Sequence, residues 1–187
     1  MKHIEGLQVA SFGTAVLAGF TFMACASATT LQKLSLDEMI QESSGIVRAK
    51  VTGSRAAWRG PSLYTYYQLQ VLEAPKGPVQ QNLEVAVTGG TADGVRQIAI
   101  GSPNLTIGSE YVIFLWTGKS GITQIIGLSQ GLFRVTKEAS GGIRLSQAAA
   151  EHMIDKAGQE VSDQAIVMTW AELKARIQKT LQKGHPK

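Results

Sequence analysis

Residues 63–71 read LYTYYQLQV and carry the clearest secondary-structure pattern in the chain. Leu63 and Leu69 fall on one side of a two-residue alternation, and Tyr64 and Tyr66 fall on the other. This period is typical of a β-strand with one buried face. We therefore expect the leucines in a core and the two tyrosines on the opposite face.

The period of two extends over about a hundred residues around this stretch, and Gly- and Pro-rich turns interrupt it. Further strands are expected at 46–58, 83–87, 95–100, 111–116, 122–126, 132–135 and 143–145. Because no helix is expected between these strands, the pattern predicts a mainly β domain, a closed antiparallel barrel or sandwich of about seven to eight strands.

Helices are expected at both ends of this domain. Ser35 and Glu38 have the spacing of a capping box, which predicts a short helix before the first strand. Residues 148–157 are expected to form one C-terminal helix, and Thr169 with Glu172 caps another. The apolar stripe of this last helix consists of Trp170, Leu173, Ile177 and Leu181.

The first 28 residues have the order of a secretory signal peptide. Lys2 gives a positive start, an apolar run covers about residues 9–24, and an A-x-A motif ends at Ala28. The run is marginal for the roughly 20 residues of a membrane-spanning helix. We therefore expect a secreted or periplasmic protein, cleaved near Ala28, with a barrel domain over 29–145 and a helical extension over 146–187 packed on the barrel.

The only cysteine, Cys25, lies inside the segment that cleavage would remove. The mature chain would then have no thiol for a disulfide, a metal site or a nucleophile. Two alternatives to cleavage at Ala28 stay open. Phe22-Met23-Ala24-Cys25 vaguely resembles a lipoprotein signal, and the apolar run could remain as an uncleaved anchor.

The positive charge of the chain belongs to its last segment. Residues 29–169 carry 12 basic and 12 acidic side chains, whereas residues 170–187 have a balance of +4. A basic face for nucleic acid is therefore not expected. The basic segment instead allows contact of residues 170–187 with an anionic membrane surface.

Several short motifs resemble a recurrent pattern of exported bacterial proteins. In that pattern an SD-x-I-V-x-G-x-V segment leads through a Trp-bearing loop to a Y-T strand, a Lys-Gly turn, a Gly-Gly loop and a V-G-L-S-Q-G-x-F-x-V-like segment. The matching residues are 43–47, 49–51, 64–66, Lys76-Gly77, Gly89-Gly90 and 126–135. The resemblance covers roughly residues 35–145, and it implies no particular activity, because none is established for that family.

A looser similarity connects the chain with netrin-like and TIMP-like domains, which are OB-type barrels. The shared elements are the first strand, the Tyr-rich second strand, the Lys76-Gly77 turn and the approach from Gly108 to Tyr111. The inhibitors of that group chelate a metal through an N-terminal cysteine, which the mature chain would lack. The similarity therefore implies an OB/netrin-like fold and not the inhibitory mechanism.

Residues 127–131 match the G-x-S-x-G pattern of α/β-hydrolases and place Ser129 at its centre. Those enzymes hold the serine on a turn between a strand and a helix, whereas strands are expected on both sides here. Asp155 or Asp163, followed by His185, would complete the chain order of a triad. A small serine hydrolase remains an alternative, and a helix directly after residue 131 would favour it.

The mature chain offers little chemistry for a metal. It contains only His152 and His185, with Glu151 and Asp155 near the first of them, and no motif with metal-ligand spacing. We expect no catalytic residue, no metal site and no cofactor.

Aromatic and charged residues near the second strand favour a binding role. Trp58 and Arg59 are expected in a loop before the strand that presents Tyr64 and Tyr66, and these four residues could form a contact patch. The alternative is that the C-terminal helix covers the rings. The sequence therefore predicts a non-catalytic module of the bacterial envelope that binds an unidentified protein or glycan.

Overall fold

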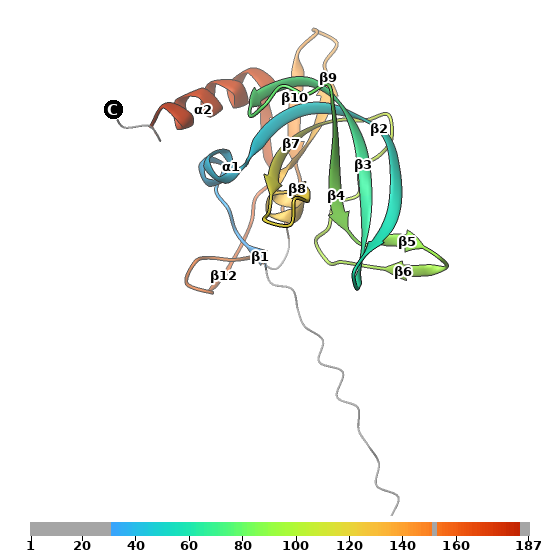
Figure 1. Cartoon of the computed structure of the whole chain (residues 1–187). Coiled ribbons are helices and arrows are strands. Elements are labelled where there is room, and N and C mark those ends of the chain that lie inside the picture. The colour runs from blue at the N-terminus through green and yellow to red at the C-terminus, as the bar shows by residue number, and fades with distance from the viewer. Residues whose placement is uncertain (1–30, 151–152, 184–187) are drawn as a thin grey trace, which may run out of the picture.

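The computed structural model describes residues 31–150 and 153–183 (Figure 1). The expected signal peptide with its cleavage site at Ala28, the alternative at Cys25, and both histidines after position 28, His152 and His185, lie outside these residues. No helix in the described ranges is both long enough and apolar enough to cross a membrane.

The described chain is mainly β. Its strands are β1 (Leu31–Gln32), β2 (Gly45–Arg59), β3 (Ser62–Lys76), β4 (Asn82–Thr88), β5 (Gly90–Ala92), β6 (Val95–Gln97), β7 (Glu110–Thr117), β8 (Thr123–Ile125), β9 (Leu132–Lys137), β10 (Ile143–Gln147), β11 (Met153–Ile154), β12 (Glu160–Val161) and β13 (Ile166–Thr169). Its helices are α1 (Leu36–Glu42), the 3-10 turn η1 (Leu128–Gly131) and α2 (Trp170–Lys183).

Five strands form a partly closed ring (Figure 1). The long strands β2 and β3 pair with each other, β3 pairs with β4, and β2 pairs with β7, all antiparallel. β8 pairs antiparallel with β7 and meets β4 in parallel at the single pair Ala86–Gln124. The ring therefore closes at a seam that is only one residue pair long.

The sheet continues beyond the ring through β9, β10 and β13, because the first half of β7 pairs with β9. One face of this extension packs against α1 and α2, and its core includes Phe114, Phe133 and Leu145. The second core fills the ring and includes Val51, Leu69 and Ile113. The expected buried side of residues 63–71 is confirmed, since Leu63 and Leu69 are buried.

Both predicted helix caps are confirmed. At α1 the Glu38 amide donates to Ser35 Oγ at 3.2 Å and the Ser35 amide donates to Glu38 Oε2 at 2.9 Å. At α2 Thr169 and Glu172 exchange the same bonds at 2.7 and 3.2 Å. These reciprocal bonds satisfy backbone donors that a helix start leaves free.

The predicted helix at 148–157 is wrong, and α2 is the only helix after β10 in the described residues. The short strands β11 and β12 form a hairpin there, and β11 pairs in parallel with β1. The Asp155 side chain accepts from the amides of Ala157 and Gln159, and Gly158 has a φ of +81°. This turn outweighs the helix propensity of the alanines before it.

The strand expected at 95–100 is also shorter, because β6 ends at Gln97. A turn follows, in which the Ser102 amide donates to the Ala99 carbonyl. Gly90 carries β5 against the β2–β3 hairpin, and a Cβ there would lie 2.6 Å from Thr65 Oγ1. The β5–β6 hairpin therefore depends on a glycine at this close approach.

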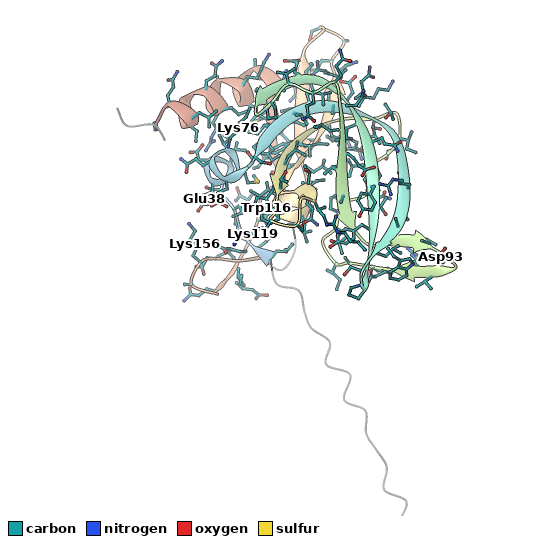
Figure 2. The ribbon with its side chains drawn as sticks, viewed as in Figure 1. Glu38, Lys76, Asp93, Trp116, Lys119 and Lys156 are labelled. Carbon is teal, nitrogen blue, oxygen red and sulfur yellow. The ribbon has the colours of Figure 1, made fainter. Side chains whose placement is uncertain are left out.

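Lys76 connects the end of β3 with the end of α1 (Figure 2). Its ammonium donates to the carbonyls of Ile40, Gln41 and Ser43. The last turn of α1 has no basic residue of its own, so Lys76 supplies both the donors and the positive charge that suit a helix C-terminus. Burial lowers the pKa of Lys76.

An ion cluster joins α2 to the sheet. Arg48 donates to Glu73 at 2.7 Å and to Glu110 at 2.8 Å, where β2 has an irregular register with β3. The second oxygen of Glu73 accepts from the Trp170 indole at 2.9 Å and from Lys174 at 3.2 Å. Burial raises the pKa of Glu73, but the donors outweigh burial and hold this pKa below its ordinary value.

Replacing Lys76 tests its role at the end of α1. Lys76→Met leaves three carbonyls without their shared donor, so the free energy of unfolding should fall by about 1–3 kcal/mol. Urea denaturation measures this change. The control is Lys50→Met at an exposed position of β2, which should change the free energy by less than about 0.5 kcal/mol. Equal effects of the two substitutions would contradict the role of Lys76.

Glu38 of the capping box should make the stability of the fold sensitive to acid. Hydrogen bonds from Lys156 and Ser35 lower the pKa of Glu38 from 4.5 to about 2. A lowered folded-state pKa stabilises the fold above the unfolded pKa, and this stabilisation is lost as the pH falls toward the folded value. The stability advantage of the wild type over Glu38→Gln should therefore shrink between about pH 5 and pH 2.

Chemical denaturation at several pH values measures this advantage. Glu42→Gln, at an exposed position of the same helix, is the matched control and should show a smaller pH-dependent difference. An advantage of the wild type that stays constant down to pH 2 would refute the expected contribution of Glu38.

Candidate functional site

A row of directly paired residues crosses the outer surface of the ring. Arg55 pairs with Tyr66, Tyr66 with Ala86, Ala86 with Gln124, and Gln124 with Trp116. Residues that lie opposite each other in neighbouring strands share one face of a sheet. In β3, β4, β8 and β7 the chain neighbour of each row member belongs to the ring core. Because successive side chains of a strand point to opposite faces, the row itself faces outward.

A cavity of about 320 Å³ opens beside the middle of this row. Ala86, Gln124 and Trp116 line one part of it. The remaining lining consists of Glu42, Val87, Thr88, Pro103, Ile125, Ile126, Gly127 and Leu128. Ala86 is only 2% exposed, so a small buried side chain lies between the aromatic rings of Tyr66 and Trp116 along the row.

The β7–β8 turn holds the Trp116 ring in place. A Cβ on Gly118 would lie 2.7 Å from the indole, which shows that the ring packs directly over this glycine. The hydroxyls of Thr117 and Thr123, at the two ends of the turn, form a hydrogen bond of 2.9 Å. Trp116 is still 45% exposed, and Lys119 extends from the same turn (Figure 2).

Three of the four predicted binding residues share the outer face. Tyr64 and Tyr66 are half-buried, with ring centroids 6.2 Å apart, and Arg59 belongs to the same side of the hairpin. The Arg59 guanidinium donates to the Ser120 carbonyl at 2.8 Å and so brings the β2–β3 turn to the β7–β8 turn.

Trp58 lies on the other face of the hairpin. It belongs to β2 rather than to a loop, and it pairs with Leu63, whose side chain is buried. Although Trp58 is 41% exposed, it therefore does not join the face of Tyr64 and Tyr66.

Sequence reasoning missed Arg55, Ala86, Gln124 and Trp116. Arg55 lies over the Tyr66 ring at 4.4 Å from its centroid and pairs with both oxygens of Glu84 at 3.0 Å. The available sequence signal was a tryptophan at the last position of the expected strand 111–116, directly before a turn that contains Gly118. Its partners across the ring depend on register, which a single strand does not reveal.

The C-terminal helix does not cover the tyrosine rings. α2 reaches β3 at Glu73, seven residues beyond Tyr66, which corresponds to roughly 23 Å along an extended strand. Trp170 and Leu173 pack in the core between the sheet and the helices instead. The alternative in which this helix shields the rings is therefore wrong.

Ser129 lies in the single turn η1, and strand β9 follows directly. The left-handed backbone belongs to Gly127 and Leu128, with φ values of +59° and +57°, and not to the serine. The motif therefore lies between two strands, β8 and β9, as expected for this chain. A strand rather than a helix comes directly after residue 131.

The basic helix is partly neutralised. Lys174 pairs with Glu73, and Arg176 pairs with Asp37 at 2.8 Å. The apolar stripe of α2 is packed in the core, so a membrane contact of this helix would rest on its charges alone. Within the described part of the chain, no three His, Cys, Asp or Glu side chains are grouped as a metal site.

Comparison with known proteins gives no match, either to a protein-family model or to a curated protein.

A substitution at Gly118 tests how Trp116 is positioned. Its backbone φ lies outside the left-handed region, so Gly118→Ala changes the contact with the indole rather than the backbone. The indole N–H resonance of Trp116 should shift in a two-dimensional NMR spectrum, with small changes elsewhere. Gly142→Ala, whose nearest neighbour is the flexible Glu138 carboxylate, is the control. An unchanged Trp116 resonance in Gly118→Ala would contradict the packing.

Proposed function

We propose that the protein is an exported, non-catalytic binding module of the bacterial envelope, whose ligand lies on the outer face of β3, β4 and β8. The observation that carries this proposal is the row from Tyr66 through Ala86 and Gln124 to Trp116, with a cavity beside it. The leader in residues 1–28 supports export.

The chemistry of the row suits a ligand with a flat apolar surface and polar edges. Tyr66 and Trp116 offer aromatic surface, and Ala86, which lies between them along the row, lines the cavity. The amide of Gln124 can donate two hydrogen bonds and accept others. Sugar rings and planar protein side chains both present such surfaces, so a glycan or a protein of the envelope fits this face.

The order of strands in the ring supports an OB-type barrel. In chain order the five ring strands are β2, β3, β4, β7 and β8. Around the ring they follow the order first, second, third, fifth and fourth, and the third and fifth form the one parallel pair. OB-type barrels are five-stranded and partly open, and they bind ligands on the face of their second and third strands. These strands are β3 and β4 here, which carry Tyr66 and Ala86.

The turns next to this face agree with the same assignment. Binding in OB-type barrels also uses the loops after the first and fourth strands. These are the β2–β3 and β7–β8 turns here, which Arg59 and Ser120 join. The expected binding residues Arg59, Tyr64 and Tyr66 therefore lie in the region of the proposed ligand, whereas Trp58 does not.

A direct test compares two exposed tryptophans on different faces. Residues 29–187 are titrated with soluble peptidoglycan fragments, and separately used to retain proteins from an envelope extract. Trp116→Ala should weaken binding of the retained species at least about 10-fold, as for a central aromatic contact. Trp58→Ala is the matched control and should bind like the wild type.

Three results would overturn the proposal. They are equal losses in the two variants, binding that neither variant affects, and the absence of any bound species from both probes. Circular dichroism of each variant checks that the fold is retained.

A further inference from the structure

A second polar surface lies away from the outer face of the ring. In β9, β10 and β13 the residues Arg134, Ser146 and Val167 lie opposite one another, in continuation of Tyr111 on β7. Their neighbours Phe133 and Leu145 point the other way into the core beneath α1 and α2. Arg134 and Val167 are exposed, so no described element covers this face of the extension.

A pocket of about 250 Å³ lies at the ring end of this face. Arg134, Ser146 and Tyr111 line it from the sheet. Ser129 reaches it from η1, and Asn104 reaches it from the segment before β7. None of the described residues that line the pocket is acidic.

Arg134 has no carboxylate partner among the described residues. In two other pockets an aspartate of the lining pairs with a cation, because Arg176 pairs with Asp37 and Lys33 pairs with Asp163. The contact of Arg134 in the structure is with the face of the Tyr111 ring, 5.7 Å from its centroid. The pocket therefore holds a guanidinium whose hydrogen-bond donors are available to a ligand.

The other polar groups of the pocket are also donors. Asn104 Oδ1 already accepts from the Tyr67 hydroxyl at 2.9 Å, which leaves the amide N–H groups of Asn104 for a ligand. The hydroxyls of Ser129 and Ser146 can each donate as well. Burial raises the pKa of Tyr111, but a hydrogen bond from the Thr106 amide and the charge of Arg134 outweigh burial and lower it.

The turn that carries Ser129 is held rigidly. The Gln130 side chain, 3% exposed, accepts from the Leu34 amide at 2.8 Å and donates to the Gln32 carbonyl at 3.0 Å. Gly127 supplies the left-handed backbone at the start of the turn. These contacts place Ser129 at the pocket without a described base beside it, which suits a hydrogen-bond donor rather than a nucleophile.

We propose that this pocket binds the carboxylate of a small polar molecule, of about the size of a sugar acid. A single guanidinium matches a single negative charge, and its planar fork suits the two oxygens of a carboxylate. Asn104, Ser129 and Ser146 then donate to the hydroxyl or carbonyl oxygens of the same molecule. The pocket shares no described lining residue with the cavity beside the row of Tyr66 and Trp116.

The test uses glucuronate as the probe and glucose as its neutral counterpart. In NMR titrations of residues 29–187, glucuronate should shift backbone resonances around residues 129, 134 and 146, at least about 10-fold more tightly than glucose. Arg134→Gln should abolish this preference, and Ser129→Ala should weaken glucuronate binding a few-fold. Arg96→Gln, at an exposed arginine of β6 away from both sites, is the matched control and should leave binding unchanged.

Two further arms separate carboxylate recognition from simple charge attraction. Arg134→Lys keeps the charge but loses the fork, so it should bind glucuronate more weakly than the wild type. The methyl ester of glucuronate should bind no better than glucose. Equal binding of glucuronate and glucose, full retention in Arg134→Lys, or sulfate binding as tight as glucuronate binding would each overturn the proposal.

Discussion

The pairing of Arg48 with Glu73 and Glu110 is the interaction on which the arrangement of the two cores depends. Arg48 lies in β2, which like β7 contributes to both cores, and its guanidinium holds carboxylates from both neighbouring strands. Glu73 in turn accepts a hydrogen bond from the Trp170 indole at the start of α2. Because these charges are partly buried, removal of one partner leaves the others uncompensated, and such a loss costs more than the intact cluster contributes.

Local rules predicted much of the fold. The capping boxes at Ser35 and Thr169 need only residues within one helical turn, and the alternation around Leu63 and Leu69 needs only one strand. The helix expected at 148–157 was wrong because that prediction also used local information alone. The alanines of this segment favour a helix locally. The pairing of Met153 with Leu31, more than a hundred positions away, stabilises an extended segment instead.

The candidate site was harder to predict because it depends on register. The register of β2 against β3 shifts between Val51 and Gly53, and this irregularity decides that Arg55 joins Tyr66 while Trp58 joins Leu63. A glycine inside a strand, such as Gly53, often marks a bulge, but it does not tell which residues pair beyond the shift. Sequence reasoning therefore found the tyrosines but grouped them with the wrong tryptophan, since Trp116 reaches the same face only through β8 and the closure of the ring.

The seam between β4 and β8 has a consequence for motion. Elsewhere the ring is closed by ladders of several pairs, but here one pair, Ala86–Gln124, joins segments that are 38 positions apart in the chain. The backbone groups on either side of this pair lack ladder partners across the seam, so local opening costs least there. Amide hydrogens at the seam should exchange with solvent at a lower opening free energy than those of β2 and β3. The single pair that closes the ring thus lies in the same row that carries Tyr66 and Trp116.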